Sequence, residues 1–326
     1  MRASRLLTLA MVIAAGIAAS AAPAFAQTRQ SFPAKPIRLV AGAFGSPSDM
    51  LARTLAPKLS ESWGQPVVVE NRTGGAGTVQ AAVVAKATPD GHTLLLISAQ
   101  FAIGAALRGS SLPYDPIKDF AGVSQLGQST SALTVAPALG VKTLKDFIAL
   151  AKARPGKILF SSGGGGSSTH ISAERFNLAA GISAVHVGMK GTPDALLEVL
   201  GGRIHYCLVG LSAGLPFIQD GRLLALAVST KRTPLLPDVP AIVEMLPGFG
   251  VDGSHAIMAP AGTPLPIRHQ ISKEVGRILD LPEIKTRLEN MAYNIAPSTP
   301  EEHDRAIRAD IKSFAEIARR LGLIDK

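Results

Sequence analysis

Two short segments rich in glycine and serine carry the groups best suited to bind an anion. The first loop is Phe44-Gly45-Ser46-Pro47-Ser48-Asp49, and the second loop runs from Ser162 to Thr169, with His170 directly after it. Each loop lies between a predicted strand and a predicted helix, where free backbone N–H groups and the helix dipole attract negative charge. Serine hydroxyls add donors with little bulk. The pattern predicts that the two loops clamp a carboxylate from opposite sides of a cleft.

These loops have a simpler interpretation as ordinary strand-to-helix turns, which also use glycine and serine. His170 then caps its helix or faces solvent instead of donating to a ligand. Neither loop contains an arginine, so recognition by amides and water tolerates varied carboxylates. The predicted ligand-binding residues are Phe44, Gly45, Ser46, Ser48, Asp49, Ser98, Ser162, Gly166, Ser167, Ser168, Thr169, His170 and Gly191.

Cofactor and metal chemistry find little support in the sequence. Neither loop has the G-x-G-x-x-G spacing of a dinucleotide site, and the chain contains no phosphate-binding G-x-x-x-x-G-K-[ST]. The seven histidines show no H-x-x-x-H spacing, and the single cysteine, Cys207, excludes an internal disulfide. We therefore expect no cofactor and no metal, and we interpret Cys207 as a small buried strand residue.

One motif favours an enzyme. Gly210-Leu211-Ser212-Ala213-Gly214 matches G-x-S-x-G, the turn that presents the nucleophile of many serine hydrolases. Pro216 and Gly221 leave only a short helix after it, and a chain this rich in Gly and Ser matches the pattern easily by chance. Asp220 or Asp238 and His255 or His269 are formally available as triad partners. A secreted serine hydrolase using Ser212 is therefore the alternative to a non-enzymatic binding protein.

The elements that must position the loops follow a repeated strand–loop–helix order, which is typical of doubly wound, mostly parallel α/β sheets. We expect strands at 37–41, 67–70, 93–98, 133–136, 158–161, 205–209, 224–229 and 256–258. Helices are expected from Asp49, from about Thr78, and over 143–154, 170–180, 192–200, 263–279 and 298–321.

Length and composition bound the remaining possibilities. The 326 residues are 47% hydrophobic and 17% charged, which excludes a largely disordered chain and favours two domains. An apolar run after Arg2 and Arg5 ends in Ala24-Phe25-Ala26, so we predict a signal peptide over 1–26 that is cleaved on export. We predict one domain from 27–129 plus 250–326, and an inserted second domain over 130–249, with a ligand cleft between them.

The net charge of +9, or +7 without Arg2 and Arg5, is compatible with an anionic ligand. No basic run with interleaved aromatic residues is present, and export also argues against a nucleic-acid partner.

Nearly all of the chain after residue 26 resembles the Bug family, the extracytoplasmic solute-binding receptors of the tripartite tricarboxylate transporter system. The resemblance rests on a series of short motifs in a shared order. They are residues 48–53, residues 64–72 with Gly74-Gly75-Ala76-Gly77, Pro89-Asp90-Gly91-His92-Thr93-Leu94, Leu112-Pro113-Tyr114-Asp115-Pro116, Lys118-Asp119-Phe120, Thr169-His170 with Glu174, Lys190-Gly191, Leu236-Pro237-Asp238-Val239-Pro240, and Ala259-Pro260-Ala261-Gly262-Thr263-Pro264.

The resemblance implies a two-domain type II periplasmic-binding fold and a receptor without enzymatic activity. Such receptors reside in the periplasm, bind small organic carboxylates between their domains through the amides and hydroxyls of two loops, and deliver them to membrane transporter subunits. We expect a monomer.

This chain departs from the family pattern at three places. In the first loop, Ser46 and Pro47 replace two glycines of the usual family motif Pro-Phe-x-Pro-Gly-Gly-Gly-x-Asp. Gly188-Met189 occupies the position where family members commonly have Pro-Tyr, and Val209-Gly210 the position where they commonly have Asp-Asn. The last two changes remove polar or aromatic bulk, so we hypothesise a roomier, less polar pocket that admits an aromatic or branched acid. The last change overlaps the G-x-S-x-G match, which favours Ser212 as a loop residue near the cleft.

Overall fold

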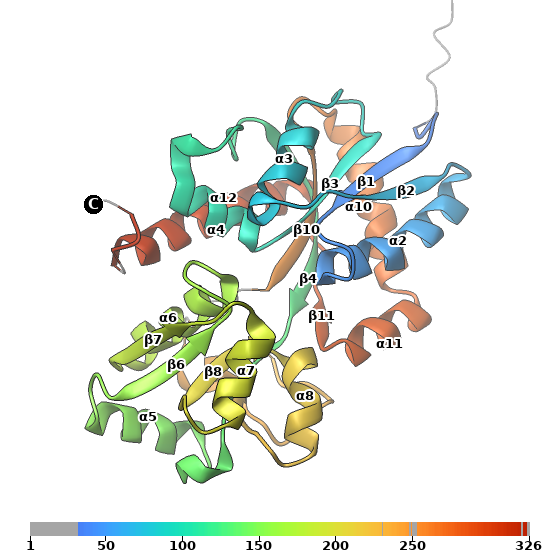
Figure 1. Ribbon diagram of the computed structural model, residues 1–326. Helices are drawn as coiled ribbons and strands as arrows, with labels where there is room; N and C mark the ends of the chain where they lie inside the picture. The colour runs from blue at the N-terminus through green and yellow to red at the C-terminus, as the bar shows by residue number, and fades with distance from the viewer. Residues whose placement is uncertain (1–31, 230, 248, 250–252, 321, 325–326) are drawn as a thin grey trace, which may run out of the picture. The chain divides into compact units, whose positions relative to one another are not determined.

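The computed structural model describes residues 32–229, 231–247, 249, 253–320 and 322–324 (Figure 1). The chain divides into the units Met1–Ala34 and Lys35–Lys326, and every element named below belongs to the second unit. The predicted signal peptide, 1–26, lies outside the described residues. Within the described ranges, no helix combines the length and the apolar character needed to cross a membrane.

The first sheet has the strand order β11-β4-β10-β3-β1-β2 (Figure 1). β1 pairs in parallel with β2 and β3, whereas β10 is antiparallel to both β3 and β4, and β11 is antiparallel to β4. The strands are β1 (Ile37–Ala41), β2 (Val67–Asn71), β3 (Thr93–Ser98), β4 (Phe120–Ser129), β10 (Ser254–Pro260) and β11 (Tyr293–Ile295).

The second sheet has the order β7-β6-β8-β5-β9. β6 pairs in parallel with β7 and β8, and β5 is antiparallel to β8 and β9. The strands are β5 (Ser131–Val135), β6 (Ile158–Ser162), β7 (Ala184–Gly188), β8 (Tyr206–Gly210) and β9 (Leu224–Val228).

The expectation of mostly parallel sheets is wrong, because both sheets are mixed. β4 leads directly into β5, and β10 returns the chain to the first sheet after β9. β10 runs back between β3 and β4, so its pairings are antiparallel on both sides. The mixed α/β class with two sheets is confirmed.

Helices flank these sheets. α10 packs against α2 and β4, and α12 packs against α4 and β4 (Figure 1). The helices are α2 (Pro47–Trp63), α3 (Thr78–Ala85), α4 (Gln100–Arg108), α5 (Leu144–Ala153), α6 (Ser168–Ala180), α7 (Thr192–Leu200), α8 (Leu211–Gln219), α9 (Ile242–Met245), α10 (Leu265–Leu279), α11 (Pro282–Asn290) and α12 (Pro300–Arg320).

The predicted elements are all present, with small shifts at their ends. α2 and α6 begin two residues earlier than predicted, because Ser46 and Ser167 cap them by accepting from the backbone N–H of the residue three positions on. The sequence analysis missed α4, β4, β7, α9, α11 and β11. α4 and β4 matter most, since both reach the candidate site.

Cys207 lies on β8 with no exposed surface, as predicted. Burial raises the pKa of its thiol to about 12, against the smaller opposing effect of hydrogen bonding with Thr134 and Ser161. The thiol is therefore protonated and unreactive in the folded protein.

Candidate functional site

A cavity of about 420 Å³ lies among the carboxyl ends of strands from both sheets. Its volume falls within the range of about 300–1,000 Å³ that is usual for small-molecule sites. No Lys, Arg, Asp or Glu is among the described residues that line it. The lining residues are Ser46, Pro47, Ser48, Ser98, Ala99, Gln100, Ser129, Ser131, Ser168, Thr169, Ser172, Thr192, Gly210, Ser212, Ala213, Gly253 and His255.

The N-termini of α2, α4, α6, α7 and α8 all border this cavity, because each contributes its cap or first-turn residues to the lining. Each of these helices follows the carboxyl end of a strand, namely β1, β3, β6, β7 and β8. A helix N-terminus carries about half a positive charge and unpaired N–H groups. The cavity therefore offers a positive potential and hydroxyl donors without any charged side chain, which favours a small anion.

The two predicted loops repeat one geometry. Ser46 (φ −70°, ψ 159°) and Ser167 (φ −69°, ψ 160°) are the N-caps of α2 and α6. Each follows a glycine in the left-handed region, Gly45 with φ 76° and Gly166 with φ 73°. In each loop the cap hydroxyl lies 3.1 Å from the hydroxyl two residues on, which belongs to Ser48 or Thr169. The third residue after each cap accepts a hydrogen bond from the glycine N–H.

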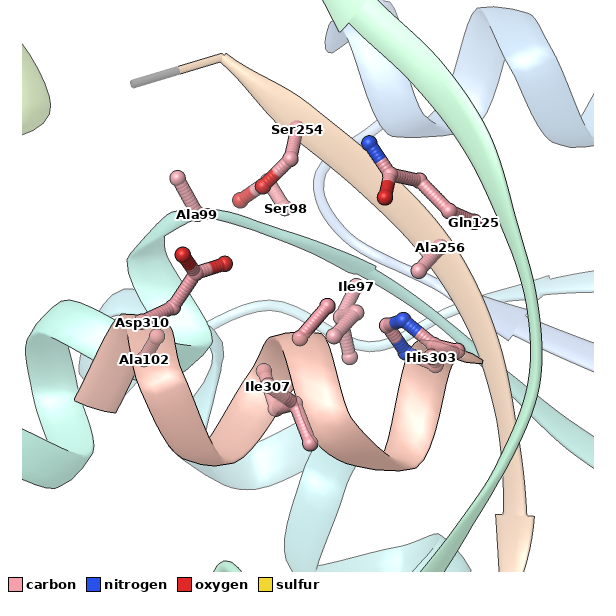
Figure 2. A pocket seen from close by; sticks show the side chains of 11 residues that line it. Ile97, Ser98, Ala99, Ala102, Gln125, Ser254, Ala256, His303, Ile307 and Asp310 are labelled. Carbon is pink, nitrogen blue, oxygen red and sulfur yellow. The ribbon is translucent and has the colours of Figure 1, made fainter. Parts of the chain in front are cut away.

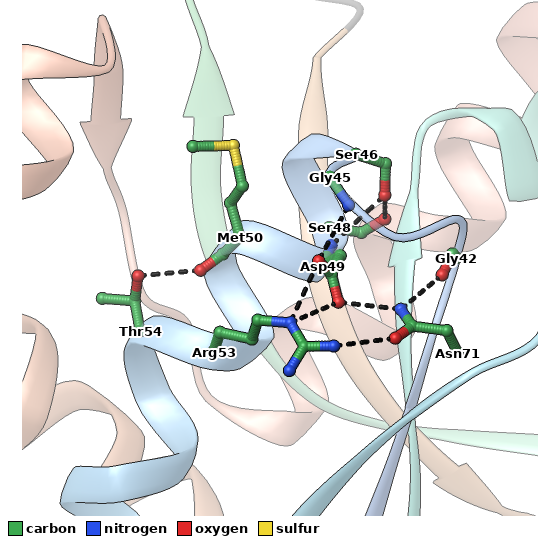
Figure 3. A network of polar contacts seen from close by, with 9 residues as sticks. All are labelled: Gly42, Gly45, Ser46, Ser48, Asp49, Met50, Arg53, Thr54 and Asn71. Carbon is green, nitrogen blue, oxygen red and sulfur yellow. Dashed lines mark hydrogen bonds and ion pairs between the residues drawn. The ribbon is translucent and has the colours of Figure 1, made fainter.

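Asp49 is that third residue in the first loop, and its carboxylate stabilises the loop through hydrogen bonds (Figure 3). Oδ2 accepts from the Gly45 N–H at 2.9 Å, Oδ1 accepts from Asn71 Nδ2 at 2.7 Å, and Arg53 Nε donates to both oxygens. Burial alone would raise the pKa of Asp49, but the hydrogen bonds from Asn71, Gly45 and Arg53 lower it overall. Asp49 therefore stays ionised, and it is not among the residues that line the cavity.

His170 has the same position in the second loop. Its Nδ1 accepts from the Gly166 N–H at 3.0 Å, and its ring stacks on that of His186 with centroids 3.7 Å apart. Ser162 Oγ lies 2.6 Å from His186 Nε2, which ties the end of β6 to β7. Burial, and then the neighbouring His170, lower the pKa of His186 to about 4, so the His186 ring is uncharged near neutral pH.

Five predicted residues line the cavity: Ser46, Ser48, Ser98, Ser168 and Thr169. The other eight do not. Phe44 is 78% exposed on the loop surface, and Gly191 is the N-cap of α7 beside the lining residue Thr192. Asp49 and His170 accept hydrogen bonds from the glycine N–H groups of the two loops. The remaining four shape the loops themselves: Gly45, Ser162, Gly166 and Ser167.

Sequence reasoning missed several polar lining residues, chiefly Ser129, Ser131, Ser172 and Thr192. Ser129 ends β4 and Ser131 begins β5, where the chain passes from the first sheet to the second. Recognising β4 would have identified this crossover. Ser172 lies four residues after Ser168, one turn further along α6.

Ser212 also lines the cavity, but on the first turn of α8 and not in a loop as predicted. His255 lines the same cavity, and burial lowers its pKa to about 4 against a weaker opposing effect of the Gly253 backbone. Among the described residues its Nδ1 has no hydrogen-bond partner, and no bond joins its ring to Ser212 or to a carboxylate. His269 pairs with Glu301 instead. The geometry of a catalytic triad is not present in the described chain.

A much smaller cavity of about 10 Å³ lies beneath Ser98 (Figure 2). It has room for about one water molecule. His303 of α12 borders it, and both ring nitrogens of His303 are buried without a partner in the described chain. The described residues also contain no cluster of three or more His, Cys, Asp or Glu side chains placed to hold a metal ion.

Comparison with known proteins agrees with the α/β fold of two sheets and with a binding site for a small anion. BugT of Bordetella pertussis is 33% identical over 327 residues, which cover 99% of each chain. The structure of Rpa4515 of R. palustris with adipate is 30% identical, covers 89% of this chain and 98% of that chain, and has a TM-score of 0.73. MatC of Rhodopseudomonas palustris with bound malate is 28% identical over 88% of this chain and 99% of that chain, with a TM-score of 0.68.

These similarities define a class, the periplasmic solute-binding receptors. The sequence profile described as "Tripartite tricarboxylate transporter family receptor" matches residues 51–323. The chain belongs to this family, which confirms the resemblance noted from its sequence.

Proposed function

We propose that this protein binds a small organic carboxylate in the 420 Å³ cavity and delivers it to a membrane transporter. The observation that carries the proposal is the convergence of the α2, α4, α6, α7 and α8 N-termini on a cavity without charged side chains. Helix N-termini stabilise an anion without fixing its shape as a bidentate arginine does. The adipate and malate in the structures of two relatives are ligands of this chemical class.

The ligand contacts in this proposal come from both halves of the chain. Ser46, Ser48 and Ser98 belong to the segment 27–129, and Ser168 and Thr169 belong to 130–249. We infer that 27–129 plus 250–326 and 130–249 are two domains that close over the ligand. The duplicated geometry of the two capped loops supports this inference, because it supplies one anion-binding turn to each domain.

We propose that the protein acts as a receptor and not as an enzyme. Ser212 lacks a hydrogen-bonded histidine and an acid in the described chain, and this supports a role as a cavity-lining hydroxyl. Export by a cleaved signal peptide, a periplasmic location, membrane transporter subunits as partners and a monomeric state complete the proposal. The family to which the chain belongs supports the location and the transporter.

The test is a binding screen on the exported form, residues 27–326, after refolding to remove any co-purified ligand. Thermal shift and then calorimetry would be run with aliphatic, branched and aromatic mono- and dicarboxylates. A ligand at about 100 times its Kd adds roughly 2.7 kcal/mol of stability, a shift of several degrees. Reversible binding of at least one acid without turnover is expected. If only short aliphatic diacids bound tightly, the idea of a roomier pocket would be wrong.

Thr169→Val and its control Thr143→Val test whether the ligand binds in the main cavity. Thr169→Val removes a cavity hydroxyl and is expected to weaken binding about tenfold, since a hydrogen bond to a charged group contributes about 1.5–3 kcal/mol. Thr143→Val removes the capping hydroxyl of α5, which lies outside the cavity, and should leave affinity unchanged. Ser212→Ala should alter affinity less than tenfold. Ester hydrolysis that disappears in Ser212→Ala would instead establish the hydrolase.

A further inference from the structure

A second cavity of about 140 Å³ adjoins the main one at the N-terminus of α2. The two share Ser46, Ser48, Ser98 and Gln100, so they form one connected site. We call this second cavity the side chamber. Its remaining lining residues are Gly42, Ala43, Gly77, Gln80 and Phe101.

Gln80 of α3 gives the side chamber its chemistry. The side chain is only 7% exposed, and its Oε1 is buried with no hydrogen-bond partner among the described residues. A buried carbonyl oxygen without a donor costs about 1–3 kcal/mol, and native proteins rarely leave one unpaired. The unpaired oxygen belongs to a residue that lines the chamber, so a donor on a bound molecule is its natural partner.

The neighbouring groups show where this donor would sit. A side chain at Gly42 would begin 3.2 Å from Ser48 Oγ, 3.4 Å from Gln80 Oε1 and 3.6 Å from Ser46 Oγ. Three oxygens therefore gather beside the Gly42 backbone, and the glycine keeps the space open. The Ser46 and Ser48 hydroxyls lie 3.1 Å apart. Figure 3 shows both residues at this turn, together with Gly42.

We propose that the side chamber is a subsite for a hydrogen-bond donor on the carboxylate ligand, a hydroxyl or amide N–H group, which Gln80 Oε1 accepts. The proposal rests on the function proposed above and narrows its ligand class to substituted acids. An ionised carboxylate has no hydrogen to donate, so a second carboxylate would leave Gln80 Oε1 unpaired. An ammonium group is disfavoured as well, because the positive end of α2 borders the same chamber.

The test uses pairs of acids that differ by one hydroxyl group: propionate and lactate, glutarate and 2-hydroxyglutarate, phenylacetate and mandelate, benzoate and 3-hydroxybenzoate. Calorimetry on residues 27–326 should find at least one pair in which the hydroxylated acid binds about tenfold more tightly. Gln80→Met keeps the length of the side chain but removes the acceptor. It should reduce this preference below about threefold and leave the affinity for the unsubstituted acid nearly unchanged.

A second variant keeps Gln80 but fills the space beside its oxygen. Gly42→Ala places a methyl group between the three oxygens and should also reduce the preference. Gly104→Ala on α4, where no atom lies within 4 Å of the new methyl group, is the matched control and should preserve it. Equal binding of both members of every pair, or a preference that survives Gln80→Met, overturns the subsite while carboxylate binding stands. If none of the acids binds in this test or in the wider screen, the proposed function and the subsite fall together.

Discussion

The folded protein should lose stability steeply between pH 6.5 and pH 4 because it buries neutral histidines. Burial lowers the pKa of His255 and of His303 to about 4. In the unfolded chain the pKa of a histidine is about 6.5. The unfolded state therefore binds more protons than the folded state between these values. The contribution of each residue is present above pH 6.5 and is lost as the pH falls toward 4.

The expected size follows from these two pKa values. At pH 5 each such histidine lowers the free energy of unfolding by about 2 kcal/mol relative to pH 7, so His255 and His303 together account for about 4 kcal/mol. His186, whose pKa is also lowered to about 4, is partly exposed and should add less. This loss is a large part of the roughly 5–15 kcal/mol that stabilises a typical folded protein.

His303→Leu isolates one of these groups. The ring of His303 makes no hydrogen bond in the described chain, and it borders the small cavity of Figure 2. Leucine is apolar and of similar volume, so stability at pH 7 should change little, while about 2 kcal/mol of the loss at pH 5 should disappear. Leu178→Gln is the control, because that exposed side chain carries no titratable group, so the pH dependence should be unchanged.

The assay is urea unfolding followed by circular dichroism at pH 7, 6, 5.5 and 5, with a check that the m value is constant. The slope of the unfolding free energy against pH gives the difference in bound protons directly. The reasoning is refuted if wild-type stability is flat between pH 6.5 and 5. It is equally refuted if His303→Leu retains the full wild-type slope, and His303→Gln provides a second variant should leucine prevent folding.

Two substitutions and one labelling experiment test the structure at separate points. Asp49→Asn removes the charge that holds the first loop, so the free energy of unfolding should fall by about 1–3 kcal/mol and ligand affinity should fall with it; unchanged values would show that the network in Figure 3 is dispensable. Gly166→Ala forces a side chain into φ 73° and to 3.3 Å from Leu107 Cδ1, and should cost about 1–2 kcal/mol in urea unfolding; a stable variant would contradict the loop geometry. Cys207 should react with a thiol reagent only in denaturant, because burial raises its pKa to about 12, and rapid labelling of the folded protein would contradict its position on β8.

The sequence by itself determined the capped loops. Ser46 and Ser167 accept from residues only three positions on, and the glycines before them pair with side chains four positions on. Hydrogen bonds of such short range depend on local residue types. The sequence analysis accordingly placed both loops correctly, although it began the two helices two residues late and did not identify Ser46 and Ser167 as their caps. The strands with continuous apolar runs and the buried Cys207 were predictable for a similar reason.

Only the tertiary structure decided which side chains reach the cavity. Asp49 was predicted to contact the ligand, but its side chain does not line the cavity and accepts a hydrogen bond from Asn71, which is 22 positions away in sequence. Ser129 and His255 line the cavity because β10 inserts between β3 and β4, and it pairs His255 with Ser98 and with Gly127. Strand pairings between residues more than 100 positions apart depend on how the whole sheet packs. No local pattern encodes them.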